Sequence, residues 1–256
     1  MEKQFFTAAI SSEIFKIISD ASKQLHLESY VIGGFVRDFL LKRGTAKDID
    51  IVAIGSGIAL AEKVASLLPN KPKVQIFKTY GTAMLRYKDV DIEFVGARKE
   101  SYSEESRNPL IFEGTLQEDQ NRRDFTINAL ALSLNEENFG ALLDPFNGME
   151  DLENGIIKTP LDPDITYSDD PLRMMRAIRF ATQLNFTIET ASLAAIAKNA
   201  KRLEIITRER IVDELNKIMG AIKPSVGFLL LEQTQLLSQL LPCLLYTSDA
   251  ADDPAS

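Results

Sequence analysis

Two aspartates, Asp48 and Asp50, stand one residue apart in the run Lys47-Asp48-Ile49-Asp50-Ile51, where charged and apolar residues alternate. A period of two is typical of a half-buried strand, and it puts both carboxylates on one face. Like charges held this close repel each other, so a divalent cation that bridges them explains the pair well. Magnesium suits an oxygen-only site that faces phosphates. Taken alone, the pair would also fit a solvated strand face.

A second alternating run, Val90-Asp91-Ile92-Glu93-Phe94, offers two more carboxylates. A third carboxylate on a neighbouring strand would complete a two-metal site, in which one ion activates an attacking hydroxyl and the other steadies a triphosphate. We expect Glu93 to be this carboxylate, with Asp91 as the alternative.

Two further clusters suit a phosphate ligand. Gly33-Gly34 falls between a short strand and a helix, so backbone amides can approach a phosphate there, and Arg37 adds a cation. Arg122 and Arg123 precede an apolar pattern that suggests a helix, where amides and two guanidinium groups could receive a triphosphate and ribose hydroxyls. A charged helix start is the simpler interpretation of the second cluster.

Asp170 and Arg173 stand three apart in a segment where Pro171 favours a helix start, so we expect their side chains to share a helix face. Together they could offer an acceptor and a donor fork to cytosine or adenine, which both present an amine beside a ring acceptor. Arg176 and Arg179 continue the same helix. A surface ion pair remains the alternative for Asp170 and Arg173.

The composition limits the kinds of catalytic and metal-binding site that the chain can form. His26 and Cys243 are the only histidine and cysteine among 256 residues, so histidine chemistry and disulfides are excluded within the chain, and any metal must be held by carboxylates. The net charge is −8, yet residues 173–217 hold nine Lys and Arg against five Asp and Glu. Lys198, Lys201 and Arg202 in this basic segment are candidate contacts to a nucleic-acid backbone. No export signal or apolar span is evident, which predicts a cytoplasmic protein.

The apolar periodicity predicts an α/β front half and a helical rear half. We expect one amphipathic helix over residues 5–27, strands over 30–32, 47–54, 82–87 and 90–95, a helix over 58–68, and a loop over 98–121. The polar Lys88-Asp89 between residues 82–87 and 90–95 suits a hairpin turn. A second hairpin through Asn135 to Asn138 follows, and after Pro171 only helices are expected. The expected domains are an N-terminal helix over 1–27, a catalytic head over 28–160, a helical neck and start of body over 161–232, and a tail over 233–256.

Segments 33–38 and 47–51 together resemble the signature motif of the class II tRNA nucleotidyltransferase and bacterial poly(A) polymerase family, within the polymerase-β-like nucleotidyltransferases. Four further segments, 122–130, 144–155, 169–180 and 208–215, are similar to its later motifs in the same order. The resemblance implies an α+β chain, with a polymerase-β-like head of mixed sheet and flanking helices followed by an all-α neck and body. It implies two Mg²⁺ ions, CTP and ATP as substrates, and the 3′ end of tRNA as partner.

The resemblance also distributes roles along the chain. It implies metal ligation by Asp48 and Asp50, with Glu93 as the further catalytic carboxylate. It implies nucleotide and triphosphate binding by Gly33, Gly34, Arg37, Arg122, Arg123, Asp124 and Asn128. It implies base selection by Asp170, Arg173, Arg176 and Arg179, and RNA binding by Arg208 and Arg210 in addition to the candidate contacts Lys198, Lys201 and Arg202.

Two features depart from the family pattern. Asp169 stands where the family's fourth motif begins with glutamate. Residues 233–256 contain no lysine or arginine, and we expect a truncated product in which residues 244–256 are foreign to the family. The expected activity is CCA addition to tRNA, with poly(A) synthesis or partial CC- or A-addition by the same site as the runner-up. A non-catalytic RNA-binding fragment is the third hypothesis.

Overall fold

The computed structural model describes residues 2–44, 48–78, 81–103 and 106–241, and the surroundings of their side chains except at 2–5 and 100–111. Lys47, Cys243 and the expected foreign tail 244–256 lie outside the described residues. The chain divides into two compact units, one formed by Met1–Ser101 with Leu110–Leu152 and the other by Tyr102–Pro109 with Glu153–Ser256. In the part that is described, no helix has the length and apolar character needed to cross a bilayer.

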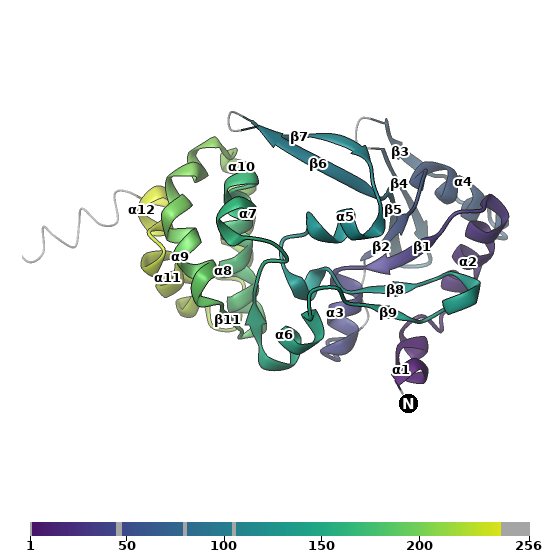
Figure 1. Cartoon of the computed structure of the whole chain (residues 1–256), viewed down its shortest axis with the longest axis horizontal. Coiled ribbons are helices and arrows are strands. Elements are labelled where there is room, and N and C mark those ends of the chain that lie inside the picture. The colour runs from purple at the N-terminus through teal and green to yellow at the C-terminus, as the bar shows by residue number, and fades with distance from the viewer. Residues whose placement is uncertain (1, 45–47, 79–80, 104–105, 242–256) are drawn as a thin grey trace, which may run out of the picture. The chain divides into compact units, whose positions relative to one another are not determined.

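A seven-stranded mixed sheet forms the centre of the first unit, in the order β3-β4-β5-β2-β1-β8-β9 (Figure 1). Strands β2 and β5 are parallel, and the other neighbouring strands are antiparallel. The expected mixed sheet and both expected hairpins, β4 to β5 and β8 to β9, are therefore confirmed. The strands are β1 (Ser29–Ile32), β2 (Asp48–Ala53), β3 (Gln75–Phe77), β4 (Thr82–Tyr87), β5 (Val90–Gly96), β8 (Ala131–Ser133) and β9 (Leu142–Leu143).

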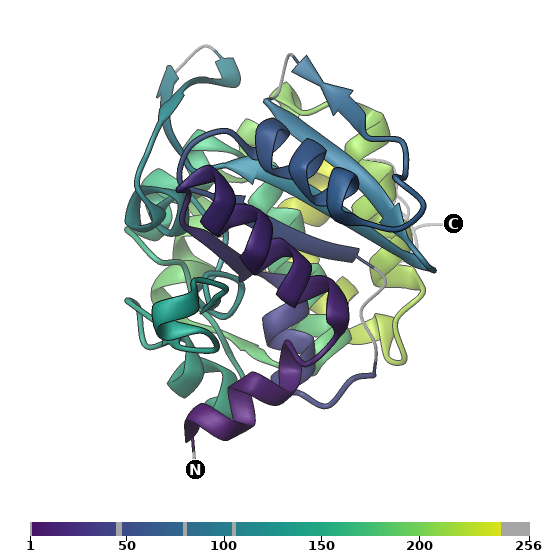
Figure 2. The same cartoon turned by 90° about the vertical axis from the view of Figure 1, so that its right-hand side faces the viewer.

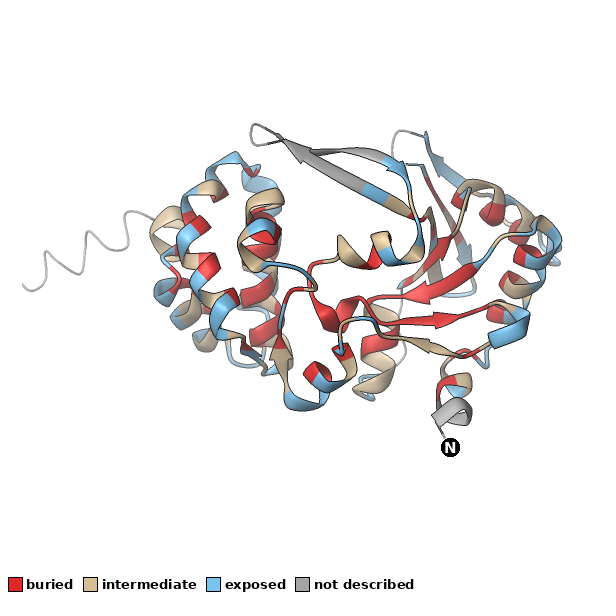
Figure 3. Cartoon of the chain, in the orientation of Figure 1, coloured by how far each residue is buried: buried red, intermediate tan, exposed pale blue. Residues whose placement is uncertain are grey.

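Helices α2 (Glu13–Leu25) and α4 (Gly57–Leu67) pack together over one face of this sheet (Figure 2). On the other face, Tyr30, Ile32 and Val52 form a small core against which Leu116 packs. Burial runs along β1 and β8, which are red over most of their length in Figure 3. The sheet therefore has apolar support on both faces, which fixes the direction of each strand side chain.

Three local expectations for the first unit are wrong. The single helix expected over 5–27 is two helices, α1 (Glu2–Ala9) and α2, because Ser12 takes extended dihedral angles before α2 begins. The loop expected over 98–121 contains the paired strands β6 (Arg98–Ser103) and β7 (Ser106–Glu113) and the helix α5 (Leu116–Asn121). The apolar pattern after Asp124 forms one 3₁₀ turn, η2 (Thr126–Asn128), and strand β8 rather than a helix.

The second unit is mainly helical. Its core contains Tyr167, Met174 and Ile178, which are fully buried, and Phe180 is buried too. The expectation of helices alone after Pro171 is wrong at one point, because β11 (Thr187–Ile188) pairs in parallel with β10 (Ile156–Ile157). The helices are α7 (Pro163–Asp169), α8 (Leu172–Leu184), α9 (Thr190–Asn199), α10 (Arg208–Met219), α11 (Pro224–Gln233) and α12 (Leu236–Leu240), with a 3₁₀ segment, η4 (Ala200–Ile205). Helix α6 (Gly148–Asn154) includes the division between the units.

Candidate active site

Asp48 and Asp50 lie on the same face of β2, because Ile49 between them is buried on the opposite face. The parallel register places Asp48 opposite Asp91 and Asp50 opposite Glu93 on β5. On its other side, Asp50 is paired with Ile32, the last residue of β1. The sheet thus brings four carboxylates of two neighbouring strands to one face, as the alternation in the sequence predicts.

The electrostatic environment of these carboxylates disfavours negative charge. Desolvation raises the pKa of Asp50, the nearby guanidinium of Arg123 opposes this effect, and the charge of Asp48 adds to it. Partial desolvation also raises the pKa of Glu93, and the charge of Asp50 raises it further. Arg98 opposes the shift at Glu93 without reversing it, whereas Asp91 has an ion-pair partner across the β4–β5 pair, with Arg86 Nε 3.9 Å from its Oδ1. This contrast supports Glu93 rather than Asp91 as the third carboxylate.

These side chains suit a hard cation. Among the residues that the structure describes, no three histidine, cysteine or acidic side chains form a ready-made metal cluster. Mg²⁺ commonly takes only one or two protein carboxylates and completes its octahedron with water and substrate phosphates. A pair of oxygen ligands whose charges repel each other fits such an ion, so Asp48 and Asp50 are suitable ligands.

The glycine turn lies directly beside Asp50. Gly33 has φ +83°, and a Cβ added to it would lie 3.4 Å from Asp50 Oδ2 and 3.1 Å from Arg123 Nη1. Its N–H donates to Leu130 O at 3.2 Å, which fixes the turn against the start of β8. Residues from three distant parts of the sequence, Gly33, Asp50 and Arg123, therefore meet at one point.

Arg122 and Arg123 are held by a residue that the sequence analysis missed. Asp119 on α5 is fully buried, and its two carboxylate oxygens accept hydrogen bonds from both guanidinium groups. Burial alone would raise its pKa, but Arg123 and Arg122 outweigh burial and hold the pKa of Asp119 below its usual value. An acid three and four residues before two arginines, at the end of a short helix, is the signal that could have identified it.

Arg37 contacts two protein side chains. Its Nε and Nη2 each donate to Asp38 at 2.9 Å, and its Nη1 donates to Asn128 Oδ1 at 2.6 Å. Asn128 Nδ2 in turn donates to Asp124 Oδ1, which also accepts the N–H of Phe125. Arg37, Asp124 and Asn128 therefore form one buried network, and these contacts support a positioning role for Arg37 rather than a direct grip on phosphate.

Asp170 and Arg173 have different local positions from those expected. Asp170 follows α7, has extended dihedral angles, and accepts the N–H of Leu172 on its Oδ1, so it does not share a helix with Arg173. Arg173 lies in the first turn of α8 and is buried, with Nη1 3.4 Å from Thr166 O. Its backbone N–H donates to Asp170 O, so the two residues remain adjacent although no common helix face joins them.

The remaining basic residues are the predicted base-selection arginines, Arg176 and Arg179, and the predicted RNA-binding residues. Arg179 is 11% exposed and donates to Glu214 at 2.5 Å, and its guanidinium carbon lies 3.9 Å from the ring centre of Phe180. Arg176 lies over the same ring at 5.5 Å. Among the residues with a predicted RNA role, Lys198, Lys201, Arg208 and Arg210 are exposed, and Lys198 also pairs with Asp164. Arg202 is half-buried and donates to Ser168 O.

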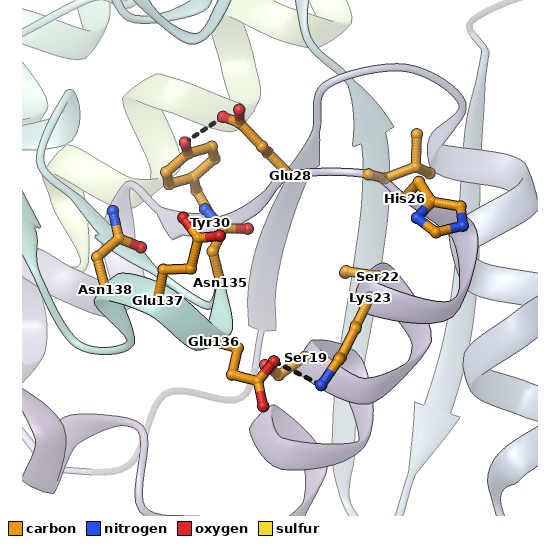
Figure 4. A pocket seen from close by; sticks show the side chains of 11 residues that line it. Ser19, Ser22, Lys23, His26, Glu28, Tyr30, Asn135, Glu136, Glu137 and Asn138 are labelled. Carbon is orange, nitrogen blue, oxygen red and sulfur yellow. Dashed lines mark hydrogen bonds and ion pairs between the residues drawn. The ribbon is translucent and has the colours of Figure 1, made fainter.

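A polar cavity of about 420 Å³ lies elsewhere in the first unit (Figure 4). Glu28, Tyr30 and Asn135 line it, so it adjoins the first residues of β1, whereas Asp50 pairs with the last one. The Tyr30 hydroxyl donates to Glu28 Oε2 at 2.6 Å, as the dashed line in Figure 4 marks. This cavity is therefore separate from the carboxylates on which the predicted chemistry depends.

Comparisons with known proteins show which family the chain belongs to. The family described as Poly A polymerase head domain matches residues 29–158, and the family described as probable RNA and SrmB-binding site of polymerase A matches residues 185–247. The A-adding tRNA nucleotidyltransferase of Aquifex aeolicus is 39% identical over 74% of this chain and 23% of that protein. The CCA-adding enzyme of Anoxybacillus flavithermus is 38% identical over 83% of this chain and 51% of that protein.

Solved structures give the same result. A CCA-adding enzyme in complex with ATP superposes with a TM-score of 0.77 at 33% identity, over 90% of this chain and 52% of that one. A tRNA nucleotidyltransferase with a primer tRNA and an incoming ATP analogue gives a TM-score of 0.74 at 31% identity, over 88% of this chain and 62% of that one. The chain spans about half the length of most of these relatives. With its head fold, its motif order and the match over residues 29–158, it belongs to the Poly A polymerase head domain family.

Proposed function

We propose that this chain is the catalytic part of a template-independent nucleotidyltransferase that adds CMP and then AMP to the 3′ end of tRNA in the cytoplasm. The observation that carries the proposal is the meeting of Asp50, Gly33 and Arg123 at one point beside Asp48. Carboxylates, a side-chain-free turn and a guanidinium group are the parts that nucleotidyl transfer requires. The similarity to CCA-adding enzymes supports CTP and ATP as the substrates.

In this proposal the primer 3′-hydroxyl attacks the α-phosphate of the nucleotide. The bond from O3′ to the α-phosphorus forms, the bond from that phosphorus to the bridging oxygen breaks, and pyrophosphate leaves. Asp48 and Asp50 would hold Mg²⁺, which when bound supplies activation of the hydroxyl and neutralisation of the triphosphate. Glu93, whose pKa is raised, is the carboxylate that we assign to accept the hydroxyl proton.

The two halves of the chain have different tasks in this proposal. Residues 28–160 carry the transfer chemistry, with Gly33, Gly34, Arg122 and Arg123 on the triphosphate. Residues 161–232 select the base through Asp170 and Arg173 and hold RNA through exposed basic residues. The excess of Lys and Arg over Asp and Glu between residues 173 and 217 supports RNA binding in an otherwise acidic chain.

A tRNA extension assay tests the proposal. Labelled tRNA that lacks its last three nucleotides is incubated with the full chain, Mg²⁺ and CTP, ATP or both, and the products are sized on a gel. Three additions followed by a halt, only when both nucleotides are present, are expected. A long ladder with ATP alone would instead indicate poly(A) synthesis, and no extension of any primer would overturn catalysis by this chain.

Addition of A alone is the second candidate, because two of the similar relatives are A-adding tRNA nucleotidyltransferases. The same assay distinguishes it with a second primer, tRNA that already ends in CC. An A-adding protein extends this primer by one residue from ATP and leaves the primer without CC unchanged. A CCA-adding protein extends both.

A further inference from the structure

Asp119 is a fully buried carboxylate that is paired with two partly exposed arginines. Its side chain is 0% exposed, whereas the side chains of its partners Arg122 and Arg123 are 17% and 15% exposed. A buried carboxylate is costly unless it is paired and hydrogen-bonded, and here one carboxylate supplies both oxygens to two arginines. The arginines therefore reach solvent while their common anchor does not.

Both guanidinium groups use the same edge for this anchor. Arg122 donates through Nε and Nη2 to Oδ1, at 3.0 and 2.5 Å, and Arg123 donates through Nε and Nη2 to Oδ2, at 3.3 and 3.2 Å. The edge of Arg123 that carries Nη1 is turned toward Gly33, where an added Cβ would lie 3.1 Å from this nitrogen. Asp119 thus determines which edge of Arg123 faces the glycine turn and Asp50.

The helix that carries Asp119 is itself firmly attached to the sheet. A capping box links Thr115 and Glu118 at its start. Gln120 Nε2 donates to Ala129 O at 2.7 Å, and Leu116 packs against the core formed by Tyr30 and its neighbours. A carboxylate on such a support can hold two flexible arginine side chains in one orientation, which lowers the entropy that they lose when they bind a ligand.

We propose that Asp119 is the positioning residue for the substrate triphosphate, because it presents the outer edges of Arg122 and Arg123 to the phosphates beside Gly33 and Asp50. This inference rests on the proposed function and extends it to a residue that contacts no substrate. A bidentate arginine held in this way binds phosphate in the ground state and in the transition state alike. Loss of the anchor should therefore raise the KM for the nucleotide much more than it lowers kcat.

The test compares Asp119→Asn with two matched controls in the full chain. Glu118→Gln removes a carboxylate one residue away on the same helix, and glutamine at this position retains the capping box. Asp151→Asn removes another buried carboxylate of the first unit, which accepts the Thr126 hydroxyl at 2.6 Å. Equilibrium binding of ATP is measured by calorimetry with Mg²⁺ and without primer, and KM and kcat are measured with primer. Circular dichroism and a thermal melt confirm that each variant is folded at the assay temperature.

Asp119→Asn is expected to weaken ATP binding and to raise the KM for ATP by about tenfold or more, with kcat within a few-fold of the parent and both controls near the parent values. In an Arg123→Gln background, Asp119→Asn should weaken ATP binding by a smaller factor than in the parent, because the anchor then positions Arg122 alone. If Asp119→Asn does not fold, Arg122→Lys and Arg123→Lys, which keep the charge and lose the fork, should give the same rise in KM.

Three results separate this inference from the proposed function. ATP binding by Asp119→Asn or by the two lysine variants that equals the parent overturns the positioning role even if the parent extends tRNA. Weakened ATP binding in those variants with a parent that never extends any primer supports the positioning role and overturns the transferase. A parent that neither binds ATP nor extends tRNA overturns both.

Discussion

Asp50 and Glu93 lie opposite each other on the parallel strands β2 and β5, and the charge of Asp50 contributes to the raised pKa of Glu93. The two residues are 43 positions apart in the sequence, 50 and 93, and the register of the two strands places them side by side. Such mutual repulsion destabilises the fold unless a cation reduces it, which is a common cost of active sites.

The first prediction concerns the metal ligands. Asp48→Ala and Asp50→Ala should each lower kcat by at least about a hundredfold, because the Mg²⁺ ions that we propose they hold would supply several kcal/mol of transition-state stabilisation. Asp50→Asn should at the same time leave the melting temperature without Mg²⁺ equal to that of the parent or higher, because it removes like-charge repulsion. Kinetics and thermal melts check the two effects. A variant of Asp48 with near-normal turnover would exclude it as a ligand.

Gly33 provides the second prediction. Its dihedral angles, φ 83° and ψ −136°, are accessible almost only to glycine. Gly33→Ala should therefore lower the free energy of unfolding by about 1–3 kcal/mol. The variant should also lower activity, since the new methyl group would displace Arg123 or Asp50.

Gly34→Ala is the matched control for stability. Gly34 begins α3 (Gly34–Leu40), and an added Cβ would meet only Arg37 Nη2 at an ordinary 3.6 Å. The free energy of unfolding of this variant, measured in urea, should lie within about 1 kcal/mol of the parent value, because alanine is a better helix former than glycine. Equal losses of stability in both variants would contradict the argument from backbone geometry.

Tyr30 gives a prediction for alkaline pH. Burial raises the pKa of Tyr30 to about 12, and the hydrogen bond to Glu28 adds to the effect. Because this pKa exceeds the unfolded value of about 10, the neutral phenol contributes stability that is complete below pH 10 and is lost as the pH rises toward 12. Free energies of unfolding of the parent and of Tyr30→Phe are measured in urea from pH 8 to 11. Above pH 10 the value for Tyr30→Phe should fall less steeply than the value for the parent. Parallel curves for the parent and the variant would show that the Tyr30 phenol has the same pKa in the folded and unfolded states.

Base selection provides the fourth prediction. Arg173→Ala should reduce the ratio of kcat/KM for CTP to that for UTP by about tenfold or more, because the donor fork that we propose rejects uracil is lost. Lys201→Ala, an exposed change, should weaken RNA binding and leave this ratio unchanged. The ratio is the informative quantity, since Arg173 is buried and its loss also affects stability. An unchanged ratio would remove Arg173 from the base-reading site.

The sequence predicted secondary structure correctly in segments where a single apolar period was clear. The alternation around Asp48 and Asp50 identified β2 and the shared face of its carboxylates, and Lys88-Asp89 identified the turn between β4 and β5. It failed where polar residues make local structure without an apolar period, as in α5, whose first turn is stabilised by the Thr115 capping box. Asp119 was missed for this reason.

The contacts between side chains were also not predicted from the sequence. Arg37 was expected to contact phosphate, yet its three donor nitrogens contact Asp38 and Asn128, and Asn128 lies 91 positions away in the chain. Asp170 was expected on a helix with Arg173, but the break between α7 and α8 falls at this residue. The contact between Arg37 and Asn128 is tertiary and no local pattern contains it. The break at Asp170 follows a local rule that was overlooked, because Pro171 disfavours helical dihedral angles at the residue before it.

The last prediction separates a buried ion pair from an exposed one at the same carboxylate. Glu214 on α10 is 5% exposed and accepts from Arg179 of α8 and from Lys217 of its own helix, whose side chain is 52% exposed. Arg179→Ala should lower the free energy of unfolding by about 3–5 kcal/mol, because it leaves Glu214 buried without its main partner and removes the link between α8 and α10. Lys217→Ala should cost about 1 kcal/mol or less, because solvent screens the exposed pair. Urea unfolding of the two variants checks the difference, and equal losses would mean that water reaches the Arg179 pair as freely as the Lys217 pair.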